Sequence, residues 1–189
     1  MEAQQVVRNA DEAREYLARL ALLPAILDGA VAKMRHDVAL GAIPPDFIVQ
    51  KSKAVVDAFI AIPAADNVLV TSFARKLATA DVPDAAAHAA KARALVETGV
   101  LPAYRRVSAY LGELAPQAPH DAGIWRLPNG PALYKAMVRH MTDSDLDPEE
   151  VHRIGLAEVA RITAEMDRLL KKEGFAEGTV GERLVALGA

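Results

Sequence analysis

The amino-acid sequence predicts an all-α protein, a multi-helix array or bundle, on three observations. Alanine is abundant and aromatic residues make up only 5% of the 189 residues, a composition typical of closely packed helices. Apolar residues recur at spacings of three and four, whereas alternating runs typical of strands are nearly absent. Prolines and glycines divide the periodic segments from one another. We therefore expect a single helical domain or fragment over 1–189.

The first two predicted helices are separated by a proline. The first runs from Asp11, as its N-cap, to Leu23, and carries a stripe of apolar residues. Pro24 is expected to start or kink a second helix, because proline lacks the N–H that an interior helical residue donates. That second helix should end at Gly41, since glycine readily takes the left-handed conformation of a helix cap.

Three further helices are predicted in the first two thirds of the chain, at 44–62, 66–78 and 83–114. The last of them contains Gly99 and Pro102, so it should kink there or divide into two. The Pro-rich stretch 115–130 follows, and it is the candidate sub-boundary within the chain. It contains Trp125, which either lines a functional surface or plugs the edge of a core, and we favour the plug.

The last third of the chain predicts three more helices. Gly130 begins one of them, which carries Tyr134 among its apolar residues. A long helix should start at Asp147 as N-cap, with Pro148 in its first turn and Glu150 completing a capping box. A second capping box, Thr179-x-x-Glu182, predicts a final helix.

The long helix has an apolar stripe at spacings of four and three, which we expect to face a core: Val151, Gly155, Val159, Ile162, Met166 and Leu169. Glycine costs about 1 kcal/mol relative to alanine inside a helix. We therefore expect a neighbouring helix to approach closely at Gly155.

Composition excludes several classes of function. The net charge is −3, without the clustered Lys and Arg that phosphate binding requires, so we expect no nucleic-acid partner. The sequence has no cysteine, which excludes disulfides and thiolate chemistry. The first residues do not resemble a signal peptide, and no apolar run reaches the ~18 residues of a membrane span. These features predict a cytoplasmic protein with no membrane partner.

No complete catalytic or metal site is expected. A helical zinc hydrolase site needs two histidines four residues apart with a glutamate between them, and no two of the five histidines have that spacing. Glu149 and His152 are three apart, as in di-iron bundles, but those bundles need two such pairs. We interpret Glu149 as a first-turn carboxylate that interacts favourably with the helix dipole.

Two residues of the helix that begins at Gly130 are candidates for substrate contact. His140 lies at the predicted C-terminal end, where a histidine is also favoured electrostatically, and this structural interpretation is the simpler one. Tyr134 either belongs to a core or presents its hydroxyl to a cleft. With Trp125, these residues form the candidate substrate-binding set.

Several segments of unusual order and spacing carry a further signal: 16–20, 100–106, 125–130, 134–142, 145–152 and 155–162. They closely resemble the bacterial family catalogued as domain of unknown function 885 (DUF885). The likeness extends from about residue 11 to the end, and its most specific block is 123–166.

The resemblance implies more than the residues show by themselves. Complete members of this family are longer and resemble helical zinc metallopeptidases of the thermolysin-related, gluzincin type. Their zinc-binding His-Glu segment lies nearer the C-terminus than this sequence reaches. The chain is therefore expected to match the N-terminal helical part of such a protein, which covers one side of a peptide-binding cleft, with no metal or cofactor bound by the chain itself.

Two functions remain open. The first is a non-catalytic helical portion of a metallopeptidase-like hydrolase that acts on a peptide substrate. The second is a stand-alone helical interaction or homodimerisation module with no enzymatic activity. A part of a larger protein should expose an apolar face where the rest packs, whereas an independent module should not. An independent enzyme that uses Glu149 and His152 is disfavoured.

Overall fold

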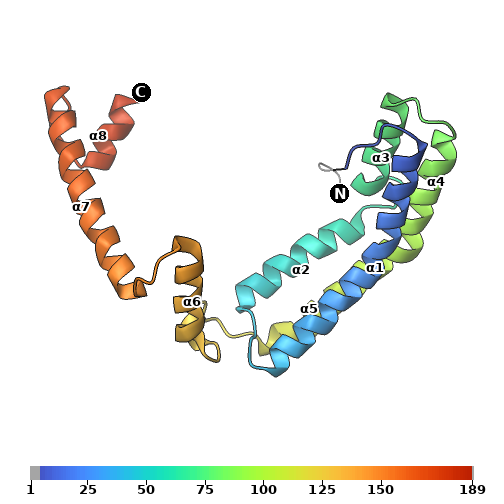
Figure 1. Ribbon diagram of the computed structural model, residues 1–189, viewed down its shortest axis with the longest axis horizontal. Helices are drawn as coiled ribbons and strands as arrows, with labels where there is room; N and C mark the ends of the chain where they lie inside the picture. Colours follow the sequence, from blue (N-terminus) through green and yellow to red (C-terminus); the bar gives the residue numbers. More distant parts are fainter. Residues whose placement is uncertain (1–4, 189) are drawn as a thin grey trace. The chain divides into compact units, whose positions relative to one another are not determined.

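The computed structural model describes residues 5–188, and within them the chain forms helices and no β-strand, as the sequence predicts. Figure 1 shows the helices in chain order. The chain divides into two compact units, residues 1–128 and 129–189. Each unit is described by itself.

The first unit contains most of the helices. They are α1 (Ala10–Ala39), α2 (Asp46–Ala61), α3 (Val68–Thr79), α4 (Ala85–Leu95) and α5 (Leu101–Leu114), with the short 3-10 turns η2 (Ala115–Gln117) and η3 (Ile124–Arg126) after them. The long helix α1 packs against both α4 and α5, α2 packs against α5, and α3 packs against α4 (Figure 1).

Two hydrophobic clusters hold the first unit together. The larger one includes Tyr16 and Phe73, whose rings stack with centroids 4.1 Å apart, and the hydroxyl of Tyr16 donates to the carbonyl of Leu69 at 2.7 Å. The smaller cluster joins α2 to α5 through Val49 and Val107. Apolar burial at both ends of α1 and α5 therefore stabilises one continuous unit.

The structure corrects two predictions for α1. Its N-cap is Asn9 rather than Asp11, because the Asn9 side chain accepts from the N–H of Glu12 at 2.9 Å. Pro24 lies inside α1 and does not start a second helix. The contacts that α1 makes with α4 and α5 along its length offset the hydrogen bond that proline removes. Gly41, with φ of +86°, does follow the helix as predicted.

The predicted break near Gly99 takes the form of a π-helical turn. The segment η1 (Val96–Val100) joins α4 to α5, and the N–H of Leu101 donates to the carbonyl of Val96, five residues earlier. This wider turn directly precedes Pro102, which lies in the first turn of α5. The chain is therefore helical without interruption from Ala85 to Leu114.

The second unit consists of α6 (Gly130–Thr142), α7 (Pro148–Lys172) and α8 (Val180–Leu187), in which α7 contacts both α6 and α8. The capping box of Thr179 and Glu182 is confirmed. At α7 the N-cap Asp147 is confirmed, but it accepts from the N–H of Glu149, and Glu150 pairs with Arg153 instead of completing a box.

The predicted packing of the α7 stripe is wrong for the described residues. Val159 is 64% exposed, Ile162 45% and Leu169 44%. A Cβ added at Gly155 would meet no atom within 4 Å, so no described segment approaches the helix there. In the second unit only Gly130, Leu170 and Arg183 are buried among the described residues.

Candidate functional site

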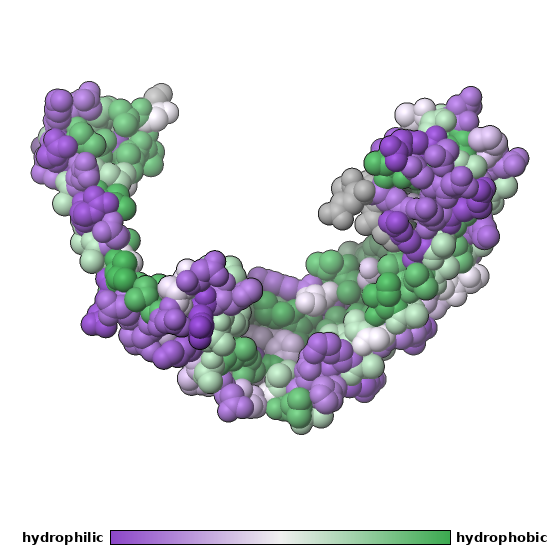
Figure 2. All heavy atoms as spheres, in the orientation of Figure 1, coloured by the Kyte–Doolittle hydropathy of each residue, from purple (hydrophilic) through white to green (hydrophobic). Residues whose placement is uncertain are grey.

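The exposed apolar surface of the second unit is its most distinctive feature. On α6, Leu133, Tyr134, Met137 and Met141 are 45%, 49%, 50% and 78% exposed. They recur at helical spacing and therefore share one face of α6. Together with the α7 stripe, they form what we call the α6–α7 apolar surface. Figure 2 shows hydrophobic surface on α7 and α8 beside hydrophilic surface on the same helices.

Several charged groups of α6 and α7 are paired within the unit. Arg161 of α7 contacts Glu158 at 2.8 Å and Glu165 at 3.4 Å. Lys135 of α6 donates to Asp147 at 3.1 Å. The N–H of Glu149 and then Lys135 hydrogen-bond to Asp147 and hold the pKa of its carboxyl below the usual range.

His140 lies in the last turn of α6, beside a shallow hollow of about 450 Å³. Arg139 contacts Asp145 at 3.1 Å across this hollow. The hydroxyl of Thr142 donates to the carbonyl of Val138 at 2.8 Å. A histidine here also benefits from the helix dipole, so its position accommodates both interpretations.

The three predicted substrate-binding residues lie on two elements, η3 and α6. Tyr134 and His140 are six positions apart on α6, which places their side chains about 120° apart around the helix. Trp125 belongs to the first unit, in η3. It is 72% exposed, so the interpretation of Trp125 as a plug is wrong.

A histidine–carboxylate contact joins the Pro-rich segment to α2. His120 Nδ1 lies 3.1 Å from both carboxylate oxygens of Asp46, and the N–H of Asp46 donates to the carbonyl of Pro119 at 2.9 Å. The hydrogen bond from His120 lowers the pKa of Asp46. The His120 side chain is 86% exposed, so this contact contributes little to stability.

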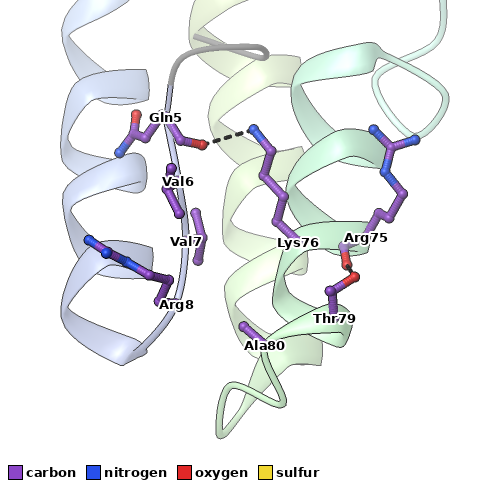
Figure 3. Close-up of a pocket in the computed structure, with 8 residues that line it drawn as sticks. All are labelled: Gln5, Val6, Val7, Arg8, Arg75, Lys76, Thr79 and Ala80. Atoms are coloured by element: carbon purple, nitrogen blue, oxygen red, sulfur yellow. Dashed lines mark hydrogen bonds between the residues drawn. The ribbon is translucent and has the colours of Figure 1, made fainter.

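The first unit also has a hollow of about 630 Å³ that the sequence analysis missed. Figure 3 shows the extended segment 5–8 along one side and residues of α3 along the other, with Lys76 donating to the carbonyl of Gln5 at 2.9 Å. Arg8 is held by Glu12, while Arg75 and Lys76 each engage further partners. The contributing segments are about seventy residues apart and carry no motif, so no local sequence signal marks this hollow.

Across 5–188, no group of three or more His, Cys, Asp or Glu side chains is arranged to hold a metal ion. Glu149 and His152 are both solvent-accessible on the first turns of α7. Within the same range, no helix is sufficiently long and apolar to cross a bilayer.

Comparison with known proteins adds three findings. The model of a family described as bacterial protein of unknown function (DUF885) matches residues 1–189. The crystal structure of a protein from Colwellia psychrerythraea, described as "the putative lipoprotein", matches at a TM-score of 0.92 and 30% sequence identity over 98% of this chain. The chain spans only 32% of that protein. No curated protein matches.

Proposed function

Because the chain belongs to this DUF885 family, we propose that it is the helical, non-catalytic portion of a longer metallopeptidase-like hydrolase and helps to wall a peptide-binding cleft. In this proposal the zinc ion and its ligands lie on residues outside these 189. Trp125, Tyr134 and His140 are the residues of this chain that we assign to peptide contact.

The observation that carries the proposal is the α6–α7 apolar surface. A protein that functions alone rarely exposes so many large apolar side chains on two helices, whereas a part of a larger protein exposes them where the rest packs. Val159 at 64% exposure and Met141 at 78% are the strongest examples. The matching protein, of which this chain spans 32%, supports the same conclusion.

One experiment on the isolated chain tests whether zinc binding and peptide hydrolysis lie outside these 189 residues. Metal analysis should find no stoichiometric zinc, and a mixture of fluorogenic peptides should remain uncleaved. One tightly held zinc ion per chain, or hydrolysis by the chain alone, would contradict the proposal.

A second experiment tests peptide contact, with the same peptides as the probe. Trp125 is the only tryptophan and is 72% exposed, so a peptide that covers it should shift its fluorescence to shorter wavelength. Tyr134→Ala and His140→Ala should each weaken binding about tenfold, equivalent to about 1.4 kcal/mol. Binding unchanged in both variants would remove these residues from the cleft.

The alternative is a stand-alone interaction or homodimerisation module. The spacing of apolar residues in the α7 stripe is the observation that supports it. From Gly155 to Leu169 the stripe alternates steps of four and three, as in the seam between two coiled helices. Sedimentation distinguishes the two. A closed dimer of fixed stoichiometry that Val159→Asp abolishes would support the interaction module. Open-ended association through the apolar surface would support the hypothesis that the chain is one part of a larger protein.

The cellular location is a separate proposal. We propose a cytoplasmic location from the absence of cysteine. The protein from Colwellia psychrerythraea is described as "the putative lipoprotein". Fractionation of cells that produce the protein from its own gene tests the proposal, and recovery in the membrane fraction would overturn it.

A further inference from the structure

The apolar stripe of α7 has the geometry of a helix-packing surface. From Gly155 it continues through Val159, Ile162, Met166 and Leu169, at steps of four, three, four and three. Such a pattern keeps apolar side chains aligned along one side of a helix over several turns, where a second helix inserts its own side chains between them. The exposed fractions of Val159, Ile162 and Leu169 show that this side is open in the described residues.

Gly155 is an independent sign of a close neighbour. A glycine inside a helix costs about 1 kcal/mol relative to alanine. Nothing in the described chain requires it, because an added Cβ would meet no atom within 4 Å. A glycine in line with the apolar stripe is explained if another backbone passes over α7 at that point.

The polar residues of α7 indicate the chemistry of the neighbour. Arg161 is engaged by Glu158 and Glu165, and Arg153 pairs with Glu150. Because these charges are satisfied within α7, a partner is recognised by apolar shape and by the gap at Gly155. The net charge of −3 adds no attraction for a polyanion.

We propose that the α7 stripe is the docking surface for an apolar helix from additional polypeptide of the kind that the longer matching protein carries, and that this helix crosses α7 at Gly155. The proposal rests on the proposed function, in which this chain is one part of a longer protein. The matching protein supports this occupant, because 98% of this chain superposes on it while most of that protein lies outside the match.

Two glycines provide a matched test. Gly29 of α1 and Gly155 of α7 are both helical, and a Cβ added at either meets nothing within 4 Å. In the isolated 189-residue chain, Gly29→Ala and Gly155→Ala should each raise Tm by about 2–4 °C. In the complete product of the natural gene, Gly29→Ala should still raise Tm, whereas Gly155→Ala should lower it because the added methyl group meets the docked helix.

A second pair of variants tests the stripe itself. Val159→Asp alters the stripe, whereas Ala160→Asp alters an exposed position about 100° around the helix from Val159, outside the stripe. Both should leave the isolated chain folded. In the complete gene product, only Val159→Asp should raise the hydrogen-exchange rate of α7, by at least tenfold.

The outcomes separate this proposal from the proposed function. A gene product that ends at the same 189 residues overturns both. A longer product in which Gly155→Ala raises Tm as much as Gly29→Ala overturns the docking proposal alone. A dimer of the isolated chain that Gly155→Ala weakens tenfold or more shows that a second copy is the occupant and also overturns it.

Discussion

Arg183 connects α8 to α7, the longest helix of the second unit. It is only 5% exposed, and its guanidinium donates to Asp167 at 2.5 Å and to the carbonyls of Phe175 and Thr179, each at 3.3 Å. A buried cation is tolerated when a carboxylate and several acceptors surround it. This one side chain therefore holds both the 173–179 turn and α8 against α7.

Replacement of Arg183 with methionine should destabilise the second unit by about 1–3 kcal/mol, because it leaves the carbonyl of Phe175 without this donor and removes the cation beside Asp167. Lys171 is the matched control, since it also contacts Asp167, at 2.8 Å, but its side chain is 56% exposed. Lys171→Met should cost less than about 0.5 kcal/mol. Urea denaturation compares the two, and equal losses would show that burial of Arg183 contributes nothing.

Asp167 makes the same contacts sensitive to acid. Hydrogen bonds from Lys171 and then Arg183 lower the pKa of Asp167 from its ordinary value of 3.8. A carboxylate whose pKa is lower in the folded state contributes stability that is fully present above pH 3.8 and is lost as the pH falls through the lowered pKa. Asp167→Asn should therefore flatten the acid limb of the stability profile. A limb of unchanged slope would contradict this assignment.

The candidate residues show what single positions reveal in a sequence. The angle between the Tyr134 and His140 side chains follows from helix geometry alone. Their separation on α6 could therefore be predicted as soon as the helix itself was predicted. The exposure of Trp125 could not, because it depends on whether a core lies beside the Pro-rich segment. The two short stretches that form the hollow at Gln5 and Lys76 meet only through the fold.

At the scale of elements, α1 and the π-helical turn contact each other through a proline and a glycine. A Cβ added at Gly99 would lie 3.2 Å from Cγ of Pro24. This distance is shorter than an ordinary van der Waals contact of a Cβ atom. Glycine at position 99 therefore lets α1 and η1 approach each other. The proline that interrupts the α1 hydrogen bonds is thus part of the contact between these elements.

Gly99→Ala should destabilise the protein by about 1 kcal/mol, because the new methyl group meets the proline ring. In a Pro24→Ala background the same change should stabilise it by about 0.5–1 kcal/mol, through the helix preference of alanine. A double-mutant cycle by thermal denaturation measures the coupling. Gly29→Ala, in open space, is the control and should have one effect in both backgrounds.

The elements that the sequence predicted best are those defined by local chemistry. The Thr179–Glu182 box and Gly41 act within one turn, and both were found where expected. Asn9 and Asp11 are both good caps two positions apart, so local preference does not separate them. Continuity through Pro24 and the π-turn depends on packing between helices, which periodicity does not encode.

At the scale of the whole molecule, buried residues are distributed very unevenly. Both hydrophobic clusters lie within residues 1–128. In the described part of the second unit, three residues are buried, and only one of these, Leu170, is a large apolar side chain. The two units should therefore differ in local stability, since burial of apolar surface supplies most of it.

Hydrogen exchange should show this difference directly. Amides of α1 near Tyr16 and of α3 near Phe73 should exchange most slowly, because both rings are fully buried. Amides of α6 and of the first turns of α7 should exchange at least a hundredfold faster in the isolated chain. Mass spectrometry of peptic fragments provides the measurement, and uniform protection along the chain would be inconsistent with this description.

The internal pairing of charges on α7 has a consequence for how its sequence can change over generations. Glu158, Arg161 and Glu165 satisfy one another, so substitutions among them need compensation only within the same helix. Gly155, Val159 and Ile162 have no such partners nearby. Substitutions at these three positions should instead covary with positions in the polypeptide that lies against them. The two faces of α7 should therefore evolve independently of each other.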